Sequence, residues 1–185
     1  DARTHLPTRA LLTDRLQQAM AQPERDQKRL AVCYLDLDAF KPINDLWGHD
    51  YGDRVLVEVA QRLKACVRAG DTVARLGGDE FVLLLGDLAN VEESEQTLDR
   101  VVMALRIPFS VFDPPQLLTA SLGVTLYPDD DADPDALLRH TDQAMYAAKQ
   151  AGGNRYHWFD ADYDRRARRY RDRLHRVRDG LAAGE

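Results

Sequence analysis

The chain has 185 residues with 44% hydrophobic and 30% charged side chains, which is the composition of an ordinary soluble globular domain with a core of its own. Its net charge of −6 excludes binding of nucleic acid through bulk electrostatics. No apolar run approaches the roughly 18 residues that span a bilayer. No signal peptide is visible, and two cysteines in predicted core elements favour free thiols, so we expect a cytoplasmic domain whose full-length protein is free to carry an anchor elsewhere.

A helix and a strand are predicted at the start of the chain. Residues 8–21 show helical spacing, with Pro23 expected to end the helix. The predicted inward face of this helix holds Leu11, Leu12, Leu16 and Ala19. Residues 30–35 are apolar, β-branched and aromatic, which is typical of a central strand covered on both faces. The strand ends in Asp36 and Asp38, and burying a carboxylate there is unfavourable unless a cation pairs with it.

Residues 41–45 are predicted to form a turn, after which a long helix runs to about Val67. The inward face of this helix is expected to hold Leu56, Val59, Ala60, Leu63 and Val67. Asp53 is expected in its first turn, where a carboxylate interacts favourably with the helix dipole. Two interpretations of Asp53 therefore stay open, a helix cap and a ligand-binding group.

The stretch Arg75-Leu76-Gly77-Gly78-Asp79-Glu80-Phe81 is the most informative part of the chain. Short strands are predicted on both sides, at 72–74 and 81–85. Two adjacent glycines between such runs indicate a tight hairpin, because glycine enters positive φ without a Cβ penalty. On this pattern alone, Asp79 and Glu80 form either a solvated acidic turn or a pair of cation ligands.

The remaining elements complete an α+β pattern. We expect a helix over 91–105, a strand pair at 109–112 and 117–126, a helix from Pro134 to Ala151 and a last strand at 155–159. This order predicts an antiparallel-centred sheet flanked by helices, a ferredoxin-like or palm-type β-α-β-β-α-β centre. The predicted domain spans residues 1–159 and is followed by a C-terminal helix over 160–185.

In this topology the first strand neighbours the hairpin, so Asp36 and Asp79 can converge. Two unpaired carboxylates about 4 Å apart repel by roughly 4 kcal/mol at an effective dielectric of 20, and divalent cations offset that cost. Oxygen ligands with open water positions suit Mg²⁺ or Mn²⁺. Paired metal ions stabilise both the attacking and the leaving oxygens in phosphoryl transfer.

Together these motifs resemble the GGDEF domain, the diguanylate cyclase family, which joins two GTP molecules into cyclic di-GMP and releases pyrophosphate. The resemblance covers residues 1–159. It is carried by five segments in the family's order and spacing: Asp36 to Asp45, Gly48-His49 with Gly52-Asp53, Gly77 to Phe81, Ala120 to Val124, and Asp142 to Lys149.

The resemblance implies a role for each matching residue. Asp36, the Leu37 carbonyl and Asp79 would hold two metal ions for each GTP, and Asp79 with Glu80 would be catalytic beside the attacking 3′-hydroxyl. Asn44 and Asp53 would bind guanine, because a carboxylate accepts from N1–H and N2–H₂ together. The other expected substrate contacts are Phe40, Lys41, Gly77, Gly78 and Lys149.

The symmetric product of the family implies a homodimer for turnover, with one GTP bound to each of two facing domains. Arg68-Ala69-Gly70-Asp71 matches the family's R-x-x-D inhibitory site, where cyclic di-GMP would act as a feedback inhibitor. Arg68 offers a planar fork to a guanine edge. The alternative for Arg68 and Asp71 is a local ion pair at a helix end.

Two stretches depart from the family pattern. Gly153 stands where many members have a phosphate-binding arginine. We therefore expect one phosphate contact to be missing, with lower GTP affinity, unless Arg155 contacts the phosphates instead. The opening, Thr4 to Arg9, differs from the usual L-T-G-L-x-N-R and affects how the first helix docks.

The tail, residues 160–185, holds eight arginines against six acids. It also has a heptad-like seam, at Tyr163, Ala167, Tyr170, Leu174, Val177 and Leu181. Two alternatives stay open, a helix packed on its own domain and a helix that leads into a further domain, such as the EAL phosphodiesterase domain of tandem family members.

The preferred hypothesis is an active diguanylate cyclase. The second is a GTP-binding module without turnover that regulates an attached EAL phosphodiesterase domain, which Gly153 and the tail favour. The third, an interaction domain, explains the seam in the tail but none of the carboxylates.

Overall fold

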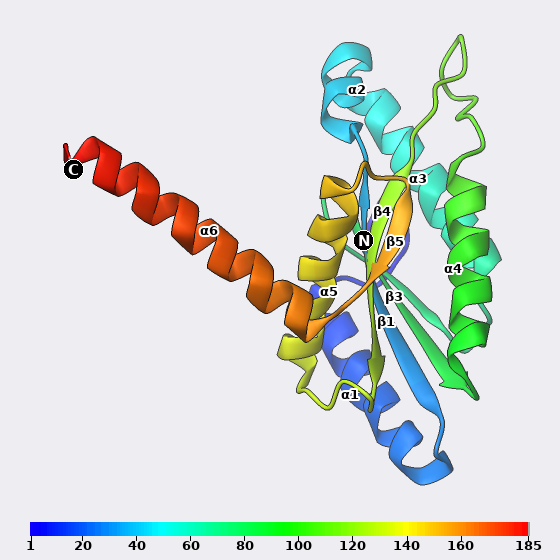
Figure 1. Cartoon of the computed structure of the whole chain (residues 1–185). Coiled ribbons are helices and arrows are strands. Elements are labelled where there is room, and N and C mark those ends of the chain that lie inside the picture. The colour runs from blue at the N-terminus through cyan, green and yellow to red at the C-terminus, as the bar shows by residue number, and fades with distance from the viewer. Residues whose placement is uncertain (185) are drawn as a thin grey trace.

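A five-stranded sheet forms the centre of the computed structural model, which describes residues 1–184 without the side chains of 22–26, 161–168, 170 and 171 (Figure 1). The strands are β1 (Arg29–Leu37), β2 (Thr72–Gly77), β3 (Glu80–Leu88), β4 (Ala120–Tyr127) and β5 (Arg155–Trp158). Their order is β2-β3-β1-β4-β5. The first four pair antiparallel in the ferredoxin-like order, and β5 adds a parallel edge to β4. The α+β prediction is confirmed, with a mixed rather than a purely antiparallel sheet.

Helices cover both faces of the sheet (Figure 1). They are α1 (Arg9–Asp26), α2 (Phe40–Trp47), α3 (His49–Cys66), α4 (Val91–Leu105), α5 (Pro134–Gln150) and α6 (Ala161–Ala182). Buried residues of α1 and α5 pack on one face, and buried residues of α3 and α4 pack on the other.

β1 is buried on both faces, as predicted from its apolar run. Cys33 and Leu35 point to the α3 and α4 side, and Val32 and Tyr34 point to the α1 and α5 side. Successive side chains of a strand alternate between faces, so Asp36 continues the second set. The alternation therefore brings Asp36 out on the side of α5, at the end of the central strand.

Several sequence predictions are confirmed closely. The hairpin of β2 and β3 closes with Gly77 opposite Glu80, and α4 has the predicted bounds with its predicted inward side chains buried. Pro134 is the first residue of α5, with Asp133 as a capping side chain that accepts from the Ala136 N–H.

Three predictions near the N-terminal half are wrong. α1 continues to Asp26 instead of ending at Pro23, since a proline removes one hydrogen bond and bends a helix without having to end it. Leu11 is exposed, while Leu12 and Leu16 are buried. Residues 41–45 form most of α2 instead of a turn. The left-handed conformation of Ala39 reverses the chain just before this helix. Pro42 falls in the first helical turn, where its missing N–H costs little.

The start of α3 also differs from the prediction. Gly48, with a φ of 93°, separates α2 from α3, which begins at His49. Asp50 therefore lies in the first turn of α3, and Asp53 lies one turn further along. The interpretation of Asp53 as a helix cap is wrong, because its carboxylate lies beyond the first turn of α3.

The predicted strand at 109–112 is absent from the described residues. The segment makes only an isolated bridge between Phe109 and Gln116, because Pro108, Pro114 and Pro115 cannot donate to a ladder. Phe109 and Phe112 are buried in the core instead. The second strand of the predicted pair is confirmed as β4, with a later start.

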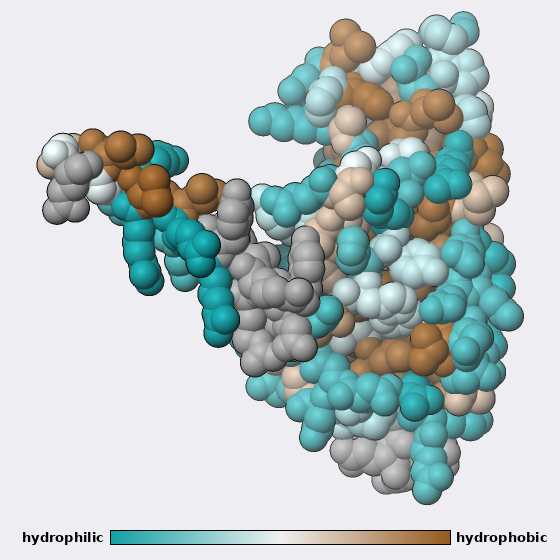
Figure 2. Space-filling model, viewed as in Figure 1, coloured by the Kyte–Doolittle hydropathy of each residue, from teal (hydrophilic) through white to brown (hydrophobic). Residues whose placement is uncertain are grey.

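α6 extends away from the sheet in Figure 1. Figure 2 shows hydrophobic side chains gathered along one side of α6, where Leu174, Val177 and Leu181 are exposed. These three positions of the predicted seam do not pack on the domain, and the side chains of Tyr163, Ala167 and Tyr170 lie outside the described residues. Within residues 1–184, no helix is both long enough and apolar enough to span a bilayer.

Candidate active site

Two acids that are distant in the sequence meet at one end of the sheet. Asp36 pairs with Glu80 in the register of β1 and β3, and the Leu37 N–H donates to the Asp79 carbonyl at 3.3 Å. The carboxyl groups of Asp36 and Asp79 lie close enough to interact electrostatically. Burial, and then Asp79, raise the pKa of Asp36 to about 7, and Lys149 opposes this effect. The predicted convergence of Asp36 and Asp79 is confirmed.

This pair fits a divalent cation. Asp36 Oδ1 is buried and makes no hydrogen bond in the structure, and a buried carboxylate oxygen without a partner is costly. A cation beside Asp36 and Asp79 would occupy that oxygen and offset their repulsion. No group of three or more His, Cys, Asp or Glu side chains in the described part of the chain is arranged as a metal cluster. Two acids alone leave room for a backbone carbonyl, water and phosphate oxygens as further ligands.

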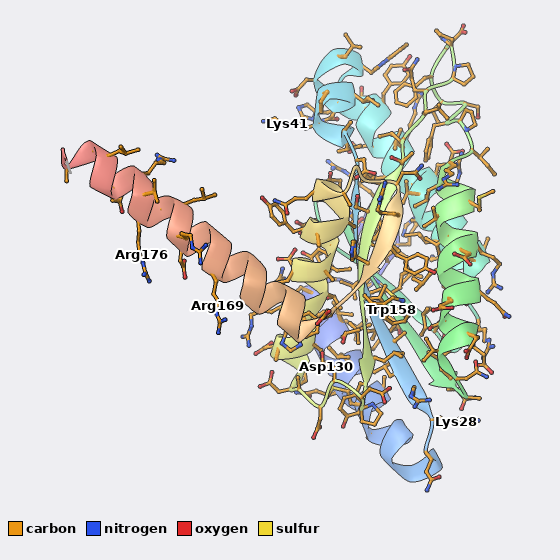
Figure 3. All side chains as sticks on the ribbon, viewed as in Figure 1. Lys28, Lys41, Asp130, Trp158, Arg169 and Arg176 are labelled. Carbon is orange, nitrogen blue, oxygen red and sulfur yellow. The ribbon has the colours of Figure 1, made fainter. Side chains whose placement is uncertain are left out.

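Lys149 of α5 supplies positive charge to the same place. Its Nζ lies 3.2 Å from Asp36 Oδ2 and 3.8 Å from Asp38 Oδ1. The predicted phosphate contact thus lies at the acidic edge, where it partly neutralises the two carboxylates in the free protein. Lys41 lies on α2 and is exposed, and Figure 3 shows its side chain pointing outward from that helix.

The Asp38 carboxylate accepts several hydrogen bonds that sequence patterns did not indicate. Its two oxygens accept from the Ser121 hydroxyl at 2.6 Å, the Thr119 hydroxyl at 2.7 Å and the Asn154 N–H at 2.9 Å. These partners stand 81 to 116 residues away along the chain. Asp38 therefore connects the end of β1 to β4 and to the turn before β5. These hydrogen bonds fix the position of the Asp38 carboxylate near Lys149.

Glu80 also has a partner that the sequence did not indicate. The Tyr34 hydroxyl donates to Glu80 Oε2 at 2.9 Å. Burial raises the pKa of Tyr34, and Glu80 adds to that effect, so the phenol stays a donor. Burial, and then Glu80, also raise the pKa of Asp142 on α5. Tyr34 thus fixes the direction of the Glu80 carboxylate.

The hairpin turn leaves its backbone open. Apart from the adjacent residues of the chain, no atom lies within 4 Å of where a Cβ would stand on Gly77 or Gly78, and the φ of Gly78 is 50°. The buried Arg75 braces the turn, because its Nη2 and Nε donate to the Gly78 carbonyl at 2.8 and 3.1 Å. The backbone of Gly77 and Gly78 is therefore open to close approach by a large ligand.

The two predicted guanine-binding residues lie on the consecutive helices α2 and α3. Asn44 of α2 lies against the bare backbone of Gly52, where a Cβ would collide with its Oδ1, and the Phe40 ring closes the other side at 3.3 Å from that Cβ position. Asp53 follows Gly52 directly. α2, which forms where a turn was expected, thus packs Asn44 against the residue that precedes Asp53 on α3.

The predicted inhibitory site lies on a separate part of the surface. Asp71 accepts from the N–H groups of Arg68 at 2.9 Å and Gly86 at 3.1 Å. Arg68 Nη2 lies 3.7 Å from Glu93, so its guanidinium makes no tight local pair with Asp71. Both residues line a pocket of about 730 Å³ that also includes Arg15 and Lys28. The Asp71 carboxylate has a structural role there, and Arg68 and Arg15 give the pocket positive charge.

The structure explains the glycine at position 153. Gly153 has a φ of 70°, and a Cβ there would lie 2.8 Å from Asp38 Oδ2. Any other side chain would strain the backbone and push against Asp38. Arg155 lies over the same turn, where its Nε donates to the Gly153 carbonyl at 2.9 Å.

Comparison with known proteins agrees with this geometry. Residues 1–155 match the family described as diguanylate cyclase, GGDEF domain. Over 181 residues, the chain is 42% identical to the bifunctional diguanylate cyclase/cyclic di-GMP phosphodiesterase MucR of Pseudomonas aeruginosa, covering 98% of this chain and 26% of MucR. The chain belongs to the GGDEF family of diguanylate cyclases.

Solved structures have the same fold. The isolated GGDEF domain of TpbB from Pseudomonas aeruginosa superposes with a TM-score of 0.86 at 37% identity, covering 91% of this chain and 98% of that domain. The GGDEF domain of DgcB from Caulobacter crescentus, solved in complex with c-di-GMP, has a TM-score of 0.77 at 26% identity, covering 85% of this chain and 94% of that chain. The chain spans about a quarter to a third of the length of the curated relatives that it matches first.

Proposed function

We propose that this chain is a working diguanylate cyclase domain, which condenses two GTP molecules into cyclic di-GMP and two pyrophosphates. The observation that carries the proposal is the meeting of Asp36 and Asp79 beside Lys149 at an open hairpin turn. Such a pair of acids is unfavourable in the free protein, and a cation with a nucleotide would offset that cost. A cytoplasmic location, where GTP is available, is part of the proposal.

Asp36, Asp79 and the Leu37 carbonyl would hold Mg²⁺ or Mn²⁺, two ions for each GTP. When bound, these ions would neutralise charge on the triphosphate and polarise the α-phosphate. The chain's own contribution is positioning and charge neutralisation, which is most of what phosphoryl transfer needs. Lys149 and Lys41 would contact phosphate oxygens, and Gly77 and Gly78 would let the triphosphate pass close to the backbone.

Asp79 and Glu80 would act at the 3′-hydroxyl that attacks the α-phosphate of the opposed GTP. Tyr34 keeps the Glu80 carboxylate directed, and a positioned carboxylate can accept the hydroxyl proton. Asn44 and Asp53 would bind the guanine edge between α2 and α3. A carboxylate there favours guanine over adenine, because adenine offers no adjacent pair of N–H donors.

The symmetric product requires two domains facing each other, so we propose that turnover depends on a homodimer. Cyclic di-GMP would also bind in the pocket beside Arg68 and act there as a feedback inhibitor through coupled sites. Arg68 is the candidate base contact, since its guanidinium is exposed and the Asp71 carboxylate already accepts two N–H groups.

A second function is a GTP-binding module that controls an attached phosphodiesterase domain. The observation that favours it is α6, which extends from the domain with an exposed apolar side, together with the match to the much longer MucR. In this alternative GTP binds without turnover. α6 would serve as the link to a following domain in either case.

A dilution series with GTP and Mg²⁺, with products separated by chromatography, tests the two functions. A cyclase forms cyclic di-GMP with a specific activity that rises with protein concentration, and Asp79→Ala abolishes product while the circular dichroism spectrum is unchanged. Absence of cyclic di-GMP at every concentration, with Arg68→Ala included to remove product inhibition, would defeat the first proposal. Binding of GTP under those conditions would support the second.

A further inference from the structure

An exposed ion pair joins the start of the chain to the proposed guanine pocket. Arg3 Nη1 lies 3.0 Å from Asp53 Oδ1, with 60% of the Arg3 side chain and 33% of the Asp53 side chain exposed. Asp53 is one of the two residues proposed to bind the base. One of its oxygens is therefore already paired with a cation in the free protein.

The backbone around Arg3 is fixed in a tight turn. Asp1 Oδ1 accepts from the N–H groups of Arg3 at 2.9 Å and Thr4 at 2.8 Å. The same carboxylate binds the buried Arg75, whose Nη1 lies 2.9 Å from Asp1 Oδ2. The Arg75 N–H also donates to the Pro7 carbonyl at 3.0 Å.

Arg75 thus connects this turn to the hairpin, because its side chain also donates to the Gly78 carbonyl. Burial lowers the pKa of Arg75, and Arg3 lowers it further while Asp53 and Asp79 oppose that effect. Arg75 therefore interacts electrostatically with the N-terminal turn, with Asp53 and with the hairpin turn. The Arg3 backbone is consequently held by hydrogen bonds, while its side chain is largely exposed.

Guanine presents two adjacent donors, N1–H and N2–H₂, and a carboxylate matches them with two oxygens. We propose that Arg3 competes with guanine for Asp53 Oδ1, so that this N-terminal turn sets the affinity of the site for GTP. The inference rests on the proposed function, and it makes Arg3 a specificity-determining residue. Inosine lacks the 2-amino group and needs a single carboxylate oxygen for its N1–H. Arg3 should therefore lower the affinity for inosine nucleotides less than the affinity for guanine nucleotides.

Calorimetric binding of the 3′-deoxy forms of GTP and ITP, with Mg²⁺, tests the inference without turnover, because these nucleotides lack the attacking hydroxyl. Arg3→Met should tighten 3′-deoxy-GTP by about two- to fivefold, the range expected for loss of one exposed ion pair. Binding of 3′-deoxy-ITP should change less, so the ratio of the two affinities should rise. Arg3→Gln should give the same result with an exposed polar side chain in place.

Arg29→Met is the matched control, since it removes an exposed arginine from an ion pair with Asp129, with an N–O distance of 2.7 Å, at the far end of β1. It should change neither affinity. If Arg3→Met leaves the ratio unaltered, or weakens both nucleotides together, Arg3 acts through charge alone and the inference is wrong. If the unmodified protein binds guanine nucleotides no better than ATP, the proposed function fails instead, whatever the Arg3 variants do.

Discussion

The carboxyl group of Asp36 in β1 lies close to that of Asp79 in the hairpin turn before β3, and burial with this proximity raises the pKa of Asp36 from 3.8 to about 7. Because the folded protein holds this proton more tightly than the unfolded chain does, the contribution to stability is complete below about pH 4 and is lost as the pH rises to about 7. Without divalent cations, we expect the free energy of unfolding to fall by roughly 1–4 kcal/mol over that interval.

Urea denaturation at several pH values, with EDTA and then with Mg²⁺, measures this effect. Mg²⁺ should recover stability at pH 8 by binding only the folded state. Asp36→Asn is the control, and it should flatten the pH dependence and remove most of the Mg²⁺ effect. If the free energy of unfolding depends on pH in the same way in the unmodified protein and in Asp36→Asn, repulsion between Asp36 and Asp79 does not cause the loss of stability.

Gly153→Arg gives the chain the arginine that many family members have, and the geometry predicts harm from it. The φ of 70° and the closeness of Asp38 together should lower the free energy of unfolding by about 1–3 kcal/mol. Thermal unfolding followed by circular dichroism measures the change. Gly70→Ala is a suitable control, since Gly70 has open space at its Cβ position and no positive φ. Unchanged stability together with tighter GTP binding would instead mean that the turn adapts to hold an arginine.

Arg68→Ala should relieve inhibition by cyclic di-GMP and leave the initial rate intact. We expect the inhibitory concentration to rise by about 5- to 150-fold, because a guanidinium contact to a guanine edge contributes about 1–3 kcal/mol. Initial rates at increasing cyclic di-GMP give this value. Asp71→Ala is a poorer probe, since it also removes the acceptor of two backbone N–H groups and should lower stability by about 1–2 kcal/mol. A lower initial rate in Arg68→Ala would assign Arg68 to the active site.

The main chemical feature of the site could be predicted from the sequence, because it depends on local patterns. Asp36 follows an apolar strand, and Asp79 follows two glycines that define a hairpin, so the topology alone brings them together. The partners of Asp38 and Glu80 could not be predicted in this way. They depend on strand register and on contacts between residues 46 to 116 positions apart, which no short motif contains. The left-handed conformation of Ala39, which starts α2, likewise carries no signal in an alanine.

Tyr34→Phe removes a single hydroxyl group from the proposed catalytic centre and keeps the buried ring. The Glu80 carboxylate then loses the donor that directs it, so we expect kcat to fall by about tenfold with little change in KM for GTP. Steady-state kinetics across GTP concentrations separate the two parameters. Tyr156→Phe removes a tyrosine hydroxyl whose pKa is raised by burial and by the nearby Asp99, away from the acidic edge, and should leave both parameters unchanged. An equal loss in both variants would indicate a general loss of stability, and a higher KM in Tyr34→Phe alone would mean that Glu80 binds substrate more than it serves the attacking hydroxyl.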